Sequence, residues 1–82
     1  MPRYFFHTAD GSVDRDTEGT ELPTLGAARK QAVHYASDVM RDQHDVFWTG
    51  TNFVIVVTDE LQTTLFTVTV HASDAIDAPS AE

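Results

Sequence analysis

Apolar residues change their spacing along the chain, and the change separates a predicted helix from predicted strands. From Leu25 to Met40 they recur every three or four residues, which is the period of one face of an α-helix. Pro23 cannot lie inside a helix, and the Thr24 hydroxyl can accept a hydrogen bond from the first turn. The pattern predicts one amphipathic helix from Leu25 to about Gln43, with Thr24 as its N-cap.

Strands are predicted on both sides of this helix. Residues 3–8, RYFFHT, form a short segment rich in aromatic side chains. A second short strand fits best at residues 20–22. Beyond the helix, residues 52–58 (NFVIVVT) and 63–71 (TTLFTVTVH) are rich in β-branched side chains, and DELQ separates them. These two segments predict a hairpin.

The predicted order is strand, strand, helix, strand, strand, which gives an α+β fold. We expect a three- or four-stranded antiparallel sheet with the helix on one face. Pairing the first and last residues of DELQ across the turn places Ile55 opposite Phe66. One helix cannot cover both faces of a sheet, so the second face needs another cover. The face expected to receive the helix is Phe53, Ile55, Val57, Phe66, Val68 and Val70. The other face carries Val54, Val56, Leu65, Thr67 and Thr69.

The chain length of 82 residues fits a single small domain, which we place at residues 1–71. Residues 72–82 are small, polar and acidic, and we expect them to form a mobile tail. The absence of cysteine excludes a disulfide framework, a thiolate zinc site and a cysteine nucleophile. No apolar run is long enough for a membrane span or a signal-peptide core. We therefore expect a cytoplasmic protein.

The charge balance bears on the possible partners. Thirteen Asp and Glu residues against five Lys and Arg residues give a formal net charge of -8. Such a field repels a phosphate backbone, which argues against nucleic-acid binding. It favours solubility and a basic protein partner.

Three stretches of the chain resemble a known family: MPRYFFH, DTEGTELPTLGAARKQA and VTDELQTTLFTVTV. Similar sequences form a family of short bacterial proteins that is classified as a domain of unknown function. Its members typically begin Met-Pro-Arg-Tyr-Phe-Phe-His, continue with Asp-x-Glu-Gly-x-Glu-Leu-Pro and an alanine-rich helix, and finish in a hairpin. Relatives often have glycine where this chain has Gln62, and DVFWTG is more aromatic than their usual loop. The resemblance implies a small α+β fold in a bacterial cytoplasm and no particular chemistry.

Residues 14–19, DRDTEG, are the nearest approach to a metal motif. Asp14, Asp16 and Glu18 alternate before a glycine, as ligands do at the start of a calcium-binding loop. Such a loop requires a bidentate glutamate at its twelfth position, which is Leu25 here. We therefore interpret the segment as a solvated turn and keep its carboxylates only as weak metal-ligand candidates.

The histidines give one further candidate metal site. His7 ends the first predicted strand and His71 ends the last, so a two-histidine site requires those ends to be adjacent. His34 and Asp38 lie four residues apart on the helix, and we interpret them as an exposed pair. Each histidine taken alone is more often structural or exposed than coordinating.

Motifs for catalysis are missing from the sequence. No serine lies in a Gly-x-Ser-x-Gly frame, and no glycine-rich loop could cradle a phosphate. We predict a protein that is not an enzyme and has no cofactor. Phe47 and Trp48 more often close a core than anchor a partner, yet tryptophan is enriched in binding hot spots, so Trp48 stays a candidate contact.

The sequence thus predicts a small, acidic, non-catalytic protein-interaction module that forms a homodimer through the sheet face away from the helix. The alternative is a small-ligand or metal-sensing protein with a site between subunits, built from His7, His71 or the carboxylates of DRDTEG. The predicted partner-binding residues are Phe5, Val54, Val56, Leu65 and Trp48.

Overall fold

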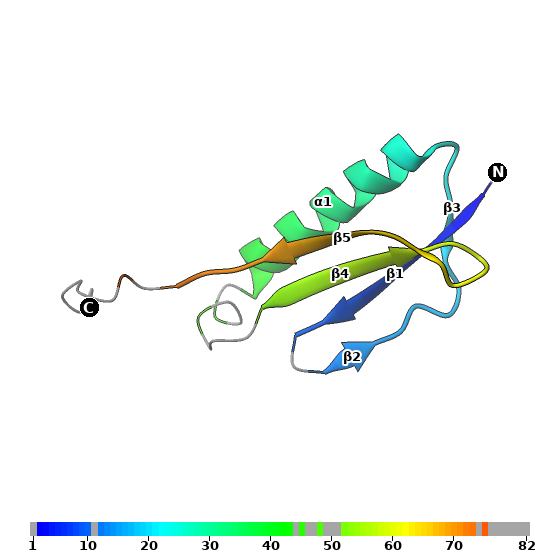
Figure 1. Cartoon of the computed structure of the whole chain (residues 1–82). Helices are drawn as coiled ribbons and strands as arrows, with labels where there is room; N and C mark the ends of the chain where they lie inside the picture. The colour runs from blue at the N-terminus through cyan, green and yellow to red at the C-terminus, as the bar shows by residue number, and fades with distance from the viewer. Residues whose placement is uncertain are drawn as a thin grey trace.

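One helix lies across one face of an antiparallel sheet in the computed structural model (Figure 1). The structure describes residues 2–10, 12–43, 45, 48, 52–73 and 75. The strand order is β2-β1-β4-β5, and β3 also pairs with β1. The predicted α+β fold is confirmed. The elements are β1 (Arg3–Ala9), β2 (Val13–Asp14), β3 (Thr20–Glu21), α1 (Leu25–Asp42), β4 (Phe53–Thr58) and β5 (Thr64–Val70).

Helix α1 begins where the sequence predicts. Thr24 is its N-cap in extended conformation, and its hydroxyl accepts a hydrogen bond of 3.1 Å from the Ala27 amide. The helix ends at Asp42, and the amide of the C-cap Gln43 donates to the Val39 carbonyl at 2.8 Å. Its spacing of apolar residues buries a stripe of small side chains that lets the helix approach the sheet closely. This stripe is Ala28, Ala32 and Ala36.

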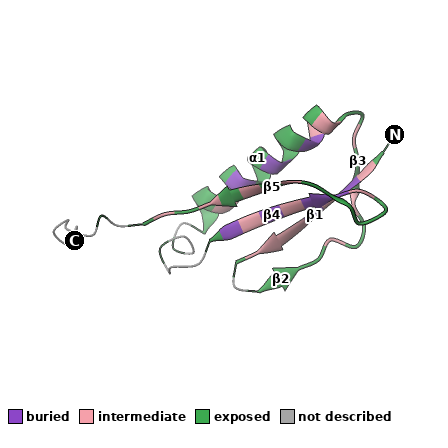
Figure 2. Cartoon of the chain, in the orientation of Figure 1, coloured by how far each residue is buried: buried purple, intermediate pink, exposed green. Residues whose placement is uncertain are grey.

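The core lies between α1 and the two central strands (Figure 2). Tyr4 and Phe6 of β1 point toward the helix, since Phe6 pairs with Val57 of β4 and both are buried. The half-buried side chains of β5 that pack against this core are those predicted from the alternation, which confirms the predicted helix-facing side. The buried members from β4 are Phe53, Ile55 and Val57, and the β5 members are Phe66, Val68 and Val70.

The predicted hairpin register is wrong by two residues. Ile55 pairs with Val68, and Phe66 pairs with Val57. The connection is a three-residue loop closed by the Asp59 amide and the Thr63 carbonyl at 3.1 Å, with Gln62 at a positive φ of 64°. A register shift between Val57 and Thr58 then adds one more residue on β5. The longer loop and the bulge each move the register by one residue. The total shift is therefore two residues, which leaves each side chain on its predicted face of the sheet.

The opposite sheet face is not covered by a helix in the described part of the chain. We call it the open face, and define it by Phe5, His7, Val54, Val56, Thr67 and Thr69. Phe5, Val54 and Val56 are half-buried, and the two threonines are exposed. No helix among the described residues is long and apolar enough to cross a membrane. Most of the predicted tail, 72–82, lies outside the described residues.

Candidate functional site

A pocket of about 520 Å³ is hollowed into the open face. Residues 15–17 form one wall, and the hairpin loop after β4 contributes Asp59, Glu60 and Gln62 on the other side. The sheet itself supplies the floor, because the alternation of the strands turns every second side chain toward this face. The floor residues are Phe5, His7, Val56, Thr58 and Thr64.

His7 is held on the pocket floor in one tautomer. Its Nδ1 accepts a hydrogen bond of 3.1 Å from the Asp16 backbone amide, so the ring proton must lie on Nε2. Nε2 then donates to the hydroxyl of the buried Thr58 at 3.1 Å. The ring also stacks on Phe5, with centroids 6.4 Å apart and planes 7° from parallel. Both ring nitrogens of His7 form hydrogen bonds within the chain. We therefore interpret His7 as a structural residue.

Asp16 ties the pocket wall to β1. Its Oδ2 accepts from the Phe6 amide at 3.1 Å, and its Oδ1 accepts from the amides of Glu18 and Gly19 at 3.1 and 3.0 Å. Partial burial raises the pKa of the Asp16 carboxyl, but the hydrogen bonds from the backbone amides of Gly19, Phe6 and Glu18 outweigh that effect. The pKa of Asp16 is therefore lowered from its usual value. The carboxylate stays charged at neutral pH and holds three amides.

Arg3 and Gly19 complete the same contact region. Arg3 donates to the Glu18 carbonyl at 2.8 Å and forms an ion pair of 3.1 Å with Glu21. Gly19 has a positive φ of 74°, and a Cβ there would lie 2.8 Å from Arg3 Cγ and 2.9 Å from Phe5 Cε2. The two N-terminal sequence motifs therefore meet in space. We call this contact the β1 clamp and define it by Arg3, Phe6, His7, Asp16 and Gly19.

The β1 clamp accounts for the Asp16 carboxylate without a metal. Both carboxylate oxygens of Asp16 accept hydrogen bonds from backbone amides. Asp14 lies exposed in β2, opposite Thr8. Leu25, at the position a calcium loop needs for glutamate, packs against the core. Across the residues that the structure describes, no three His, Asp or Glu side chains are grouped to hold a metal ion.

The structure does not bring His7 and His71 together. His7 lies opposite Val56, whereas His71 Nδ1 is 2.6 Å from the side-chain oxygen of Asn52. Asn52 and Val56 are four residues apart, which is about 13 Å along a strand. Asp74, which together with the two histidines could have completed such a site, and His44, the fourth histidine of the chain, lie outside the described residues.

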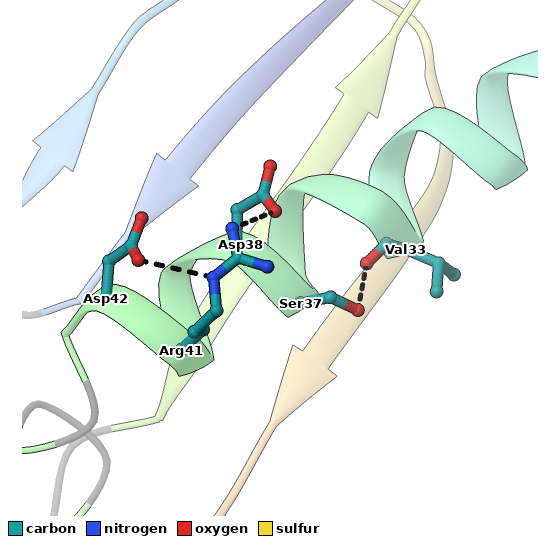
Figure 3. A network of polar contacts seen from close by, with 5 residues as sticks. All are labelled: Val33, Ser37, Asp38, Arg41 and Asp42. Atoms are coloured by element: carbon teal, nitrogen blue, oxygen red, sulfur yellow. Dashed lines mark hydrogen bonds and ion pairs between the residues drawn. The ribbon is translucent and has the colours of Figure 1, made fainter.

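Asp38, one member of the exposed helix pair interpreted from the sequence, has another partner. Asp38 forms an ion pair of 2.9 Å with Arg41, which also reaches Asp42 at 3.4 Å (Figure 3). His34 is exposed. Asp38 is therefore engaged in a surface pair with Arg41.

The predicted partner-binding residues lie in two settings. Phe5, Val54 and Val56 are half-buried on the open face. Leu65, at the bulge of β5, is 37% exposed, and Trp48 is 58% exposed. Trp48 is not among the buried core residues, which argues against its closing the core, and Phe47 lies outside the described residues.

Sequence reasoning missed the roles of Asp16 and Thr58 in building the pocket. For Asp16 the one local signal is a glycine three residues later, the spacing of an aspartate that caps a turn. Thr58 carries no signal, because its bond to His7 joins residues 51 apart.

Comparisons with known proteins identify a family and no characterised relative. No curated protein and no solved structure matches the chain. A family model matches residues 3–71, from the first residue of β1 to just past the end of β5. The chain therefore belongs to the family described as a domain of unknown function, DUF6894.

Proposed function

We propose that the chain is a small, non-catalytic protein-interaction module that self-associates and binds a basic protein partner through its open face. The observation that carries this proposal is the uncovered face itself, with a pocket floored by Phe5 and Val56. An apolar hollow rimmed by polar groups is typical of a docking surface.

The rim of the pocket supports a basic partner. Asp59 and Glu60 line it, and Glu60 is exposed. Arg15 is the one cation among the lining residues. Together with the net charge of -8, this rim would attract Lys and Arg side chains over several ångströms.

The non-catalytic part of the proposal rests on how the polar groups of the pocket are used. His7 and Asp16 resemble a base and an acid, yet their contact runs from the Asp16 backbone amide to the His7 ring. Their remaining hydrogen-bonding atoms are directed at Thr58 and backbone amides. Neither group is free to exchange a proton with a substrate in this arrangement.

The family resemblance supports a shared scaffold. We propose that relatives with the two N-terminal motifs use them to build the same β1 clamp in a bacterial cytoplasm. The clamp would fix one wall of the open face and leave its chemistry to residues outside the motifs.

Affinity capture from the native host tests the open face. We expect the wild-type chain to retain a basic protein at about 0.1 M salt and release it at about 0.5 M, where charge attraction is screened. Val56→Asp, on the pocket floor, should lose this protein. His34→Asp adds the same charge on the exposed helix surface and should retain it. Retention by Val56→Asp at the wild-type level would contradict the proposal.

The size of the pocket favours a second candidate function, a small-ligand or metal sensor. A volume of about 520 Å³ falls in the range of small-molecule sites. Thermal melts at fixed protein concentration, with a metabolite panel and with divalent metals or EDTA, test it. A rise of several degrees with one compound, abolished by Val56→Asp in the same melt, would favour a ligand site over a protein-docking face.

A further inference from the structure

The two edges of the sheet differ in their readiness to pair with another strand. On one side of β1, β2 and β3 are two residues long, and β2 contains Asp14 and leads into Arg15. On the other side, β5 runs for seven residues, TLFTVTV, without a charge or a proline. Short, charged edges resist pairing with another chain, whereas long, uncharged edges present free backbone groups that favour it.

The flank of α1 above β5 carries two exposed apolar side chains, Val33 and Met40. Gln31 and Tyr35 line a small pocket with residues of β1 and β2, so this side of the helix faces β1. Val33 lies midway in sequence between Gln31 and Tyr35. Two residues correspond to about 200° of rotation around a helix, so Val33 is on the side opposite to both. Met40, seven residues further, shares that side. Val33 is 56% exposed and Met40 is 47% exposed. In Figure 3, Val33 projects from the flank of the helix that overlies β5.

We propose that β5 pairs antiparallel with β5 of a second copy across a two-fold axis, so that one sheet continues through both copies. The two α1 helices then lie on the same face of that sheet, with the Val33 and Met40 flanks opposed. This inference rests on the self-association that the proposed function includes. It moves the contact between copies from the open face to the edge of β5. The open face stays free for a different partner.

Self-complementarity of the β5 sequence points to a second copy. With the axis at Val68, Phe66 lies opposite the partner's Val70, and Thr67 lies opposite the partner's Thr69. Aromatic with β-branched and threonine with threonine are favourable cross-strand pairs in an antiparallel sheet. Phe66 and Val70 project to the helix side of the sheet, where both are half-buried. An isologous contact of this kind closes as a dimer.

Charge also selects this edge for contact between copies. The chain has 13 Asp and Glu residues, yet none lies between residues 63 and 72. Two copies that each carry a net charge of -8 repel one another wherever acidic surfaces meet. Joining along β5 keeps the carboxylates of both copies away from the axis.

Single cysteines locate the contact directly, because the natural chain has none. Val68→Cys places two thiols at the axis, where directly opposed residues have Cα atoms about 4.5–5.5 Å apart, within disulfide reach. We expect mild oxidation to give a covalent dimer with Val68→Cys, or between Thr67→Cys and Thr69→Cys chains mixed in equal amounts, because the register opposes residues 67 and 69. Val56→Cys, on the open face, should give no covalent dimer under the same oxidation. A covalent dimer of Val56→Cys, with none from Val68→Cys or from the mixed Thr67→Cys and Thr69→Cys chains, would overturn the inference.

Surface variants provide an independent measurement by light scattering behind a sizing column. Val33→Lys/Met40→Lys changes two exposed helix side chains, so the fold should persist, and we expect the dimer dissociation constant to rise at least about tenfold. Val56→Asp should leave it unchanged. His34→Lys, on the outer helix surface, is the charge control. A wild-type particle of 9.1 kDa at micromolar concentration would overturn self-association altogether.

The two proposals fail in different experiments. If the cysteine and light-scattering results exclude the β5 edge, capture of a basic protein that depends on Val56 still stands. If capture fails while Val68→Cys gives the covalent dimer, the self-associating edge stands and the open-face partner does not.

Discussion

The Asp16 carboxylate joins β1 to the segment that leads into the helix, and its charge should be visible in the pH dependence of stability. Its pKa is lowered in the folded chain. A lowered pKa stabilises the fold above the unfolded value of about 3.9, and that stabilisation is lost as pH falls through the folded pKa. We predict that Asp16→Asn lowers the free energy of unfolding at pH 7 by about 1–3 kcal/mol. Urea unfolding at pH 7 and pH 3 should show the difference from wild type shrinking at pH 3.

Gly19 should tolerate no side chain. Its positive φ and the close approach of Arg3 and Phe5 make Gly19→Ala destabilising by about 1–3 kcal/mol. The matched control is Gly26→Ala in α1, where the nearest atom is 3.7 Å from the added Cβ. That change should stabilise the chain by up to about 1 kcal/mol. Thermal melts that show equal effects of the two substitutions would refute this account of Gly19.

Calcium should not bind to residues 14–19. Both Asp16 oxygens accept backbone amides, and Leu25 occupies the position of the required glutamate. Isothermal titration with millimolar calcium should give no saturable heat. Micromolar binding that disappears in Asp16→Ala would contradict the assignment.

At the level of elements, the hairpin loop carries strain that one substitution should relieve. Gln62 adopts a positive φ of 64°, which glycine adopts freely and other residues adopt at a cost. We predict that Gln62→Gly stabilises the chain by about 0.5–1 kcal/mol. Gln43→Gly, at a residue with a φ of -131°, is the control and should not stabilise. Chemical denaturation of both variants measures the difference.

Periodicity predicts the elements well because it reflects local burial, and it predicts their pairing poorly. The helix bounds and the Thr24 cap depend on neighbours within four residues. The hairpin register depends on the loop around Gln62 and on the bulge near Leu65. Each shifts the register by one residue, and together they leave the side chains on the same face of the sheet. Alternation alone cannot distinguish registers that differ by two, so Ile55 was paired with the wrong residue.

The candidate site was harder to predict than the fold. Phe5 and Val56 could be placed on the open face from alternation. The bonds that shape the pocket, from Asp16 to Phe6 and from His7 to Thr58, join residues 10 and 51 apart. Only the paired strands bring these groups together.

For the whole molecule, the net charge predicts how self-association responds to salt. Each copy carries a formal charge of -8, so repulsion opposes the dimer most where screening is weakest. We predict tighter association at about 0.3 M than at about 0.02 M salt, measured by sedimentation at several protein concentrations. Association that weakens as salt is added would indicate attractive charge pairs between copies instead.

The central position of β1 has a consequence for biosynthesis. β1 is translated first, yet its main partner β4 follows much later, as the contact between His7 and Thr58 across 51 residues shows. At about 5–20 residues per second, a ribosome needs about 3–10 s to supply that partner. During this interval the side of β1 that pairs with β4 is open, and Tyr4 and Phe6 lack the part of the core that β4 supplies. We expect the nascent chain to be most exposed to aggregation and to holding chaperones just before residues 53–58 leave the ribosome.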